Sequence, residues 1–157
     1  MKILVAIEGS EFSRSALESA IAYFGNSKDN ELILVTAVDP IIPPIEPFAV
    51  SAEYIQRMDD TAREAGHALL DKTLETVRTE HPNLAATITT RFLTGAPAQM
   101  IVEEAESCDA DLIVMGSHGY GFWHRTMLGS VSNSVMHHAP CSVMIVRTQA
   151  SASAASK

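Results

Sequence analysis

The 157-residue chain has few cysteines, few basic residues and few aromatic residues. The two cysteines, Cys108 and Cys141, are too few for a disulfide framework and lack a metal-ligand spacing, which favours a reducing compartment. Eleven Lys and Arg against nineteen Asp and Glu give a formal charge of −8. Because nucleic-acid binding depends on neutralising phosphates with basic side chains, we expect no nucleic-acid partner.

The sequence also lacks targeting signals and long apolar runs. No apolar run approaches the roughly 20 residues that span a bilayer, and the first residues lack the small-residue cleavage pattern of a secretory signal. We therefore expect a cytoplasmic protein with no membrane association. The length fits one domain, over residues 1–147, and the Ala- and Ser-rich residues 148–157 predict a disordered tail.

Short apolar runs alternate with helical patterns along the chain. The runs predict strands over residues 2–7, 32–38, 85–93, 111–115 and 143–146. Apolar residues at helical spacing predict helices over residues 13–24 and 55–77, from Pro97, and over 130–138. Gly25 would end the first helix in a left-handed conformation. The alternation predicts an α/β fold, an open doubly wound parallel sheet with helices on both faces and a Rossmann-like arrangement.

A glycine-rich loop lies between the fourth strand and the last helix. It reads Gly116, two residues, Gly119, nine residues, then Gly129 and Ser130. Glycines permit positive φ and let backbone amides approach an anion, and a helix N-terminus favours phosphate. The loop predicts phosphate binding. The alternative is that the glycines only turn the chain and Ser130 caps the helix.

This loop, the N-terminal V-A-I-E-G-S-E-F-S and the closing A-P-C-S-V-M-I-V together resemble the universal stress protein family. The resemblance covers residues 1 to about 147 and implies a sheet of order 3-2-1-4-5. Members with this glycine pattern form an ATP-binding branch. The resemblance therefore implies a nucleotide-binding module of the stress response that holds ATP with Mg²⁺ on its phosphates. It also implies a homodimer through the last strand, between Val143 and Val146.

The resemblance implies two groups of site residues. The phosphates and ribose would be held by Gly116, Gly119, Gly129, Ser130, the backbone of Val131 and the hydroxyl of Ser132. The adenine would be lined by Ile7, Glu8, Ala37 and Val38. His118 lies inside the loop, where it would hydrogen-bond a phosphate or the ribose without a catalytic role.

Two features depart from the family pattern. Glu8 stands where the family usually has Asp; its extra methylene either still reaches the adenosine or crowds the base pocket, unless Glu8 is an exposed acid in a turn. Phe122 and Trp123 are bulky for a surface loop and would contact a partner or pack over the loop.

Alternatives to a nucleotide-binding module remain open. A slow ATPase would have only Arg125, His118 and His124 near the phosphates, with no Walker lysine and no arranged base. A nucleotide-free interaction protein would use the proline-rich segment that contains four of the seven prolines, between Pro40 and Pro47. A dehydrogenase is excluded because the turn after the first strand lacks G-x-G-x-x-G.

Overall fold

The computed structural model describes residues 1–39, 51–119 and 128–147, and it contains one parallel sheet. The strands are β1 (Lys2–Ala6), β2 (Glu31–Val38), β3 (Thr87–Thr94), β4 (Leu112–Gly116) and β5 (Ser142–Val146). Their order across the sheet is β3-β2-β1-β4-β5, and each neighbouring pair is parallel. The predicted α/β fold and strand order are confirmed.

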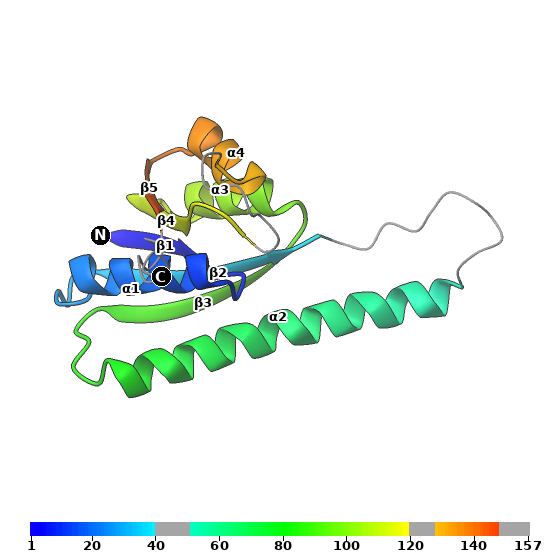
Figure 1. Ribbon diagram of the computed structural model, residues 1–157, viewed down its shortest axis with the longest axis horizontal. Helices are drawn as coiled ribbons and strands as arrows, with labels where there is room; N and C mark the ends of the chain where they lie inside the picture. Colours follow the sequence, from blue (N-terminus) through cyan, green and yellow to red (C-terminus); the bar gives the residue numbers. More distant parts are fainter. Residues whose placement is uncertain (40–50, 120–127, 148–157) are drawn as a thin grey trace, which may run out of the picture.

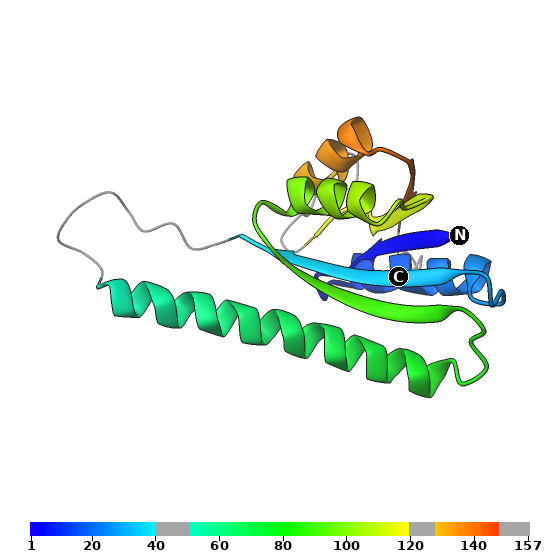
Figure 2. The same cartoon turned by 180° about the vertical axis from the view of Figure 1, so that it is seen from behind.

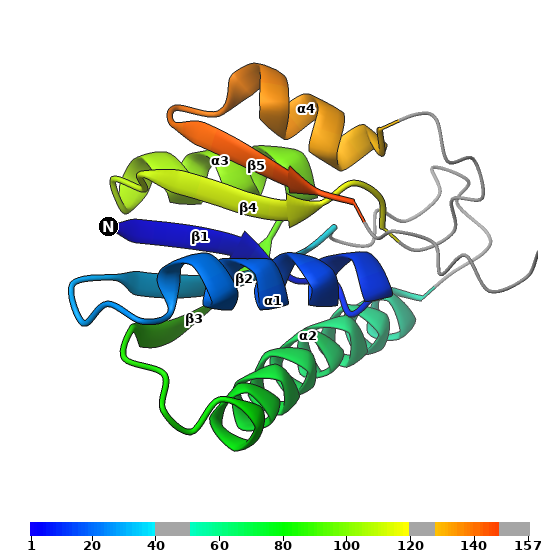
Figure 3. The same ribbon diagram turned by 60° about the vertical axis from the view of Figure 1, so that its left-hand side comes forward.

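Helices cover both faces of the sheet (Figure 1). They are α1 (Glu11–Phe24), α2 (Ala52–Glu80), α3 (Pro97–Ser107) and α4 (Ser130–His138). Helices α1 and α2 lie on one face and α3 and α4 on the other, and Figure 3 shows α1 in front of the strands and α3 behind them. This is the doubly wound arrangement that the alternating pattern predicts.

Two helices begin earlier than their apolar spacing predicts. The side chain of Ser10 accepts a hydrogen bond from the Ser13 amide before α1, and Ser51 does the same for the Tyr54 amide before α2. Serine is favoured at this position because its oxygen satisfies an amide that has no partner within the helix. Each first turn mixes polar residues with isolated apolar ones, such as Phe12 in α1 and Tyr54 in α2, so the regular apolar spacing starts only after it.

The core consists of two apolar layers, one on each face of the sheet. The layer under α1 and α2 includes Ile3, Val5, Leu32 and Leu34, and the layer under α3 and α4 includes Leu4, Val35, Ile113 and Val135. Neighbouring residues of one strand therefore point into different layers. This burial on both faces explains why the strands read as continuous apolar runs.

Helix α2 extends past the end of the sheet, as Figures 1 and 2 show from opposite sides. None of its first 14 residues is buried, and its buried residues are Gly66, Leu70 and Val77. Gly66 brings the helix against β3, since a Cβ atom there would lie 2.2 Å from Cε2 of Phe92. The packing of α2 thus starts at Gly66 and runs toward its C-terminus.

Gly25 ends α1 in a way that differs from the prediction. Its φ is −68°, in the right-handed region, so the expected left-handed cap is wrong. Glycine is required there for space: a Cβ atom would lie 2.5 Å from the Ile21 oxygen and 2.5 Å from Cδ1 of Leu84. The Gly25 carbonyl accepts hydrogen bonds from the amides of Ala85 and Ala86, which places the start of β3 against the end of α1.

Several predicted features lie outside the described residues. They are the proline-rich segment, the loop that holds Phe122, Trp123, His124 and Arg125, and the tail over residues 148–157. Among the helices that the structure describes, none combines the length and the apolar character needed to cross a membrane.

Candidate functional site

A cavity of about 330 Å³ lies at the carboxyl ends of β1, β2 and β4. The chain leaves β1 toward β2 on one side and reaches β4 on the other, so this is the point where the strand order reverses. Open α/β sheets bind ligands at this point. All the predicted site residues except Val38 line the cavity: Ile7, Glu8, Ala37, Gly116, His118, Gly119, Gly129, Ser130, Val131 and Ser132.

The prediction missed five apolar residues of the cavity wall. They are Ala6, Val35, Pro97, Ile101 and Met115. Three of them, Ala6, Met115 and Pro97, lie at strand ends or at the start of α3, and the other two lie within β2 and α3. A sequence pattern gave no reason to separate them from ordinary core residues. The general rule that ligands bind at the carboxyl ends of the strands was the signal that pointed toward them.

The N-terminus of α4 forms one wall of the cavity. Gly129 precedes the helix, and no side chain caps it. The first intrahelical bond runs from the Asn133 amide to the Gly129 carbonyl, at 2.9 Å. The amides of Ser130, Val131 and Ser132 have no acceptor within the part of the chain that the structure describes. These amides and the positive end of the helix dipole make this wall suited to an anion.

The motif glycines owe their role to space and not to positive φ. In the described residues only Gly9 and Gly95 among the glycines have positive φ, so this part of the expectation is wrong for Gly116, Gly119 and Gly129. A Cβ atom on Gly116 would lie 2.7 Å from Cβ of Phe12, in the first turn of α1. Gly116 therefore lets the end of β4 approach the start of α1.

Polar side chains hold the glycine loop in place. The buried hydroxyl of Ser132 donates to the Gly116 carbonyl at 2.8 Å, which joins α4 to the end of β4. The Gly129 amide donates to the Ser117 carbonyl at 2.9 Å. Nδ1 of His118 lies 3.0 Å from Oγ of Ser117, and its ring packs against Phe12. The loop is thus fixed at both ends before any ligand arrives.

Glu8 lies half-buried in the cavity wall and is not an exposed acid in a turn. Ser10 donates a hydrogen bond to its carboxylate, and a Cβ atom on Gly119 would lie 3.8 Å from the same oxygen. Burial raises the pKa of the Glu8 carboxyl above its ordinary value, and the hydrogen bonds from Ser10 and Ser13 oppose this shift only in part.

The residues present fit a nucleotide of modest size. The cavity volume falls in the range of small-molecule sites, which is about 300–1,000 Å³, and it has an apolar wall on one side and unpaired amides on the other. Glu8 is the single carboxylate among the described lining residues. A Mg²⁺ ion here would take most of its oxygen ligands from phosphates and water, as this ion commonly does.

Comparison with known proteins places the chain in a family. The model of the universal stress protein family matches residues 1–147. The chain belongs to the universal stress protein family. A universal stress protein of Methanothermobacter thermautotrophicus is 33% identical over 147 residues, which covers 94% of this chain and 95% of that protein. The resemblance noted in the sequence is therefore confirmed for the whole described domain.

Solved universal stress proteins share the fold. UspA of Lactobacillus plantarum is 23% identical and has a TM-score of 0.76, covering 94% of this chain and 97% of its own. A universal stress protein solved in complex with cAMP is 24% identical, with a TM-score of 0.64 and 95% and 98% covered. An Arabidopsis thaliana member with AMP bound is 20% identical, with a TM-score of 0.66 and 96% and 93% covered.

The two cysteines lie in the layer under α3 and α4. Both side chains are partly buried and unpaired by disulfides. Burial raises the pKa of the Cys108 thiol and of the Cys141 thiol, which disfavours the reactive thiolate form. Both cysteines therefore act as small apolar residues that pack in the core.

Proposed function

We propose that this universal stress protein binds an adenine nucleotide, with ATP and Mg²⁺ as the physiological ligand, in the cavity at the carboxyl ends of β1, β2 and β4. The observation that carries the proposal is the uncapped N-terminus of α4 facing an apolar wall across one cavity. Two family members of the same fold, solved with AMP and with cAMP, support the adenine assignment.

The phosphates would lie at the start of α4. The unpaired amides of Ser130, Val131 and Ser132 would donate to phosphate oxygens, and the exposed hydroxyl of Ser130 adds a further donor. A net charge of −8 does not oppose this, because the positive potential comes from backbone amides and the helix dipole at short range. Gly119 leaves room beside this wall, since among the described residues beyond its chain neighbours the nearest atom to a Cβ position there is 3.8 Å away.

The base would lie against the apolar wall. Ile7, Ala37, Val35, Pro97 and Ile101 offer a surface without charge, which suits a flat aromatic ring. Glu8 stands at the rim between this wall and Gly119, where its carboxylate can accept a hydrogen bond from the ribose or from the amino group of the base. In this proposal the longer acid replaces the usual Asp without closing the pocket.

The experiment that tests the proposal identifies what the protein carries. Freshly purified protein is denatured, released nucleotides are identified by chromatography and mass spectrometry, and binding of added ATP, AMP and cAMP is measured by calorimetry with and without Mg²⁺. We expect adenine nucleotides to be released and ATP to bind. Phosphate release over hours would separately reveal slow hydrolysis.

A matched pair of variants on α4 decides whether the glycine loop is the site. Ser130→Asp places a carboxylate in the cavity at the first helical residue, and we expect ATP binding to fall by at least about tenfold, since a repulsive charge of this kind costs over 1.4 kcal/mol. Asn133→Asp places the same charge on the exposed face of α4 outside the cavity lining. Equal effects of both variants would place nucleotide binding away from the start of α4. A parent protein that binds no nucleotide would lead instead to the interaction-protein function.

A further inference from the structure

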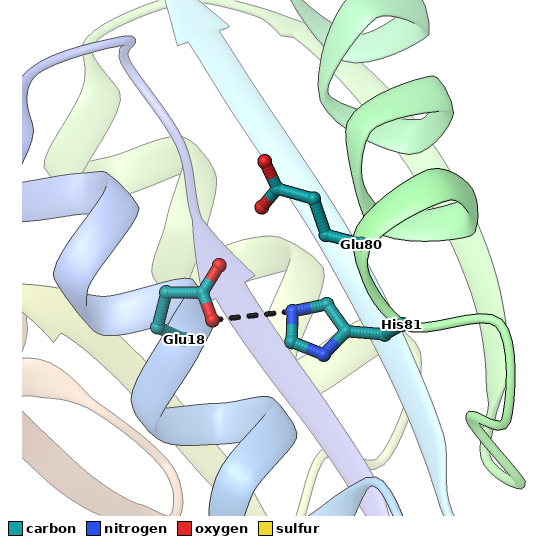
Figure 4. A group of neighbouring side chains, drawn as sticks. All are labelled: Glu18, Glu80 and His81. Carbon is teal, nitrogen blue, oxygen red and sulfur yellow. Dashed lines mark ion pairs between the residues drawn. The ribbon is translucent and has the colours of Figure 1, made fainter.

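We propose that Glu18, Glu80 and His81 form a binding site for a divalent transition metal, of which Zn²⁺ is the best match. The three side chains lie away from the nucleotide cavity, where α1 meets the end of α2 (Figure 4). One donor atom from each lies within 4.8 Å of the others. Among the residues that the structure describes, this is the one group of three metal-ligating side chains so close together.

Local chain geometry brings two consecutive residues to the same point. Glu80 is the last residue of α2, and His81 follows it as the capping residue with φ −124° and ψ 60°, outside the helical region. Proline at position 82 disfavours a helical conformation of the residue before it. Because the chain leaves the helix at His81, its side chain turns toward α1, where Glu18 lies in the middle of the helix.

The imidazole of His81 carries the strongest sign of a missing ligand. Its Nε2 atom is shielded from solvent and makes no hydrogen bond to any described residue. The nearest charged atom is Oε2 of Glu18 at 3.2 Å, a contact that lacks hydrogen-bond alignment. A buried nitrogen without such a bond costs free energy, and a metal ion between the two side chains would satisfy both.

The distances suit a tetrahedral ion. Zinc binds imidazole nitrogen and carboxylate oxygen at about 2.0–2.2 Å, so neighbouring ligand atoms are roughly 3.4 Å apart in a tetrahedral site. The 3.2 Å between Glu18 and His81 already matches this edge. Glu80 is exposed and ends a helix, so its carboxylate can move inward by the remaining distance. Water would take the fourth position.

Charge also favours a cation at this point. Two carboxylates converge near the C-terminal end of α2, where the helix dipole adds negative potential. Arg14 and Lys72 line the same groove between α1 and α2 as the two carboxylates. Within the described residues neither of them forms an ion pair with Glu18 or Glu80, so the carboxylates are not already neutralised by these side chains. The mixture of one nitrogen and two oxygens favours zinc over Mg²⁺ or Ca²⁺, which prefer oxygen alone.

The consequence of metal binding would be a link between α1 and α2. The two helices cover one face of the sheet, and α2 has only three buried residues of its own. An ion held by Glu18 from α1 and by Glu80 and His81 from the end of α2 would fasten the longer helix to the rest of the fold. Binding of the ion then stabilises the native state by mass action.

The test measures zinc binding by the full chain without nucleotide or Mg²⁺. Protein treated with chelator and dialysed is titrated with Zn²⁺ by calorimetry, and its melting temperature is recorded with and without the ion. We expect one strong site per chain, a dissociation constant below about 10 µM and a higher melting temperature with zinc. Substitution with Co²⁺ should give the visible absorption of a four-coordinate site.

Matched variants distinguish zinc binding at this site from zinc binding by other histidines. In His81→Gln and Glu18→Gln we expect binding to weaken by at least about tenfold, the loss of 1.4 kcal/mol or more. His137→Gln removes an exposed histidine at the end of α4 and should bind zinc as the parent does. Circular dichroism verifies folding, and Glu80→Gln, which changes an exposed side chain, tests the site without disturbing the core. No binding below 100 µM in the parent, or binding unchanged in His81→Gln and Glu80→Gln, would overturn the proposal.

Discussion

At the residue scale, the glycine motif combines two different requirements. Gly116 is needed because α1 approaches the end of β4 so closely that a Cβ atom would lie 2.7 Å from Phe12. At Gly119 the nearest described atom beyond its chain neighbours lies 3.8 Å from the Cβ position, so its small size serves the open side of the cavity. One sequence motif thus contains a glycine for packing and a glycine for access.

This difference predicts that alanine lowers the unfolding free energy at one of the two positions and leaves it nearly unchanged at the other. Gly116→Ala would force α1 away from β4, and overpacking of this kind costs about 1–3 kcal/mol of unfolding free energy. Gly119→Ala should leave the unfolding free energy within about 0.5 kcal/mol of the parent, as at other uncrowded positions. Urea denaturation of both variants makes the measurement. If both variants were equally destabilised, the close approach of Phe12 to Gly116 would not be the reason that glycine is needed there.

Glu8 predicts a pH dependence of stability. Because burial raises its pKa in the native state above the ordinary value of 4.5, the native state binds more protons than the unfolded chain between the two pKa values. Stability contributed by this group is therefore full below pH 4.5 and decreases as the pH rises through the raised pKa. We expect Glu8→Gln to be more stable than the parent at pH 7, with the difference vanishing near pH 4.

The measurement compares urea denaturation of the parent and Glu8→Gln between pH 4 and pH 7, without nucleotide. Glu64→Gln, at an exposed position of α2, serves as the control for the general loss of one negative charge. A difference between parent and Glu8→Gln that grows toward acid pH would contradict the role of burial at this carboxylate.

At the scale of elements, the sequence predicted every strand and helix that the structure describes, and also the first residues of α3 and α4. It did not predict where α1 and α2 begin or how the helices pack. Apolar runs located the strands because both faces of the sheet are covered. Helix starts were missed at Ser10 and Ser51 because the capped first turns carry few apolar residues. The predicted left-handed conformation of Gly25 was wrong because glycine is required there for close contact with Leu84, a residue far away in the sequence.

Helix α2 depends on tertiary contact in the same way. At one of its positions we expect Gly to be more stable than Ala, the reverse of their helix propensities. In an exposed helix Ala is more stable than Gly by about 1 kcal/mol. At Gly66, however, a Cβ atom would lie 2.2 Å from the ring of Phe92, so we expect Gly66→Ala to be destabilised by about 1–3 kcal/mol as α2 moves away from β3. Thermal and urea denaturation give the magnitude.

The control for this prediction is the neighbouring residue. Ala65→Gly, at an exposed position one residue earlier, should lose about 1 kcal/mol from helix propensity alone. If Gly66→Ala were more stable than the parent, propensity would outweigh the contact with Phe92, and the docking of α2 on β3 would be looser than these distances require.

At the scale of the whole molecule, the sequence located the site better than it described it. The strand order brings the turn after β1, the end of β2 and the glycine loop to one cavity, and the predicted residues except Val38 line it. Ala6, Val35, Ile101 and Met115 were missed because their role depends on which end of a buried element faces the cavity. The cluster of Glu18, Glu80 and His81 was missed because it joins residues about 60 positions apart that share no motif.

The last prediction, a homodimer, concerns the edge of the sheet at β5. Among the described strands, β5 pairs with β4 alone, and its other side is an edge of the sheet that these strands form. Its apolar residues from Val143 to Val146 are only partly buried, and they belong in part to both core layers. An apolar edge strand invites pairing with another chain unless charges or bulges protect it. We therefore expect two copies to associate along β5, with a mass by light scattering of twice that of one chain.

A lysine substitution on β5 tests whether this strand forms the dimer interface. Ile145→Lys places a charge on a partly buried residue of the edge strand β5. Charged side chains are the device by which natural edge strands avoid pairing, so this variant should give a monomer. Tyr23→Lys changes the charge equally on α1, where the side chain is 70% exposed, and should remain a dimer. Circular dichroism verifies that both variants keep the fold. A monomeric parent at micromolar concentration would mean that β5 stays an open edge, and a dimeric Ile145→Lys would move the interface to another face of the molecule.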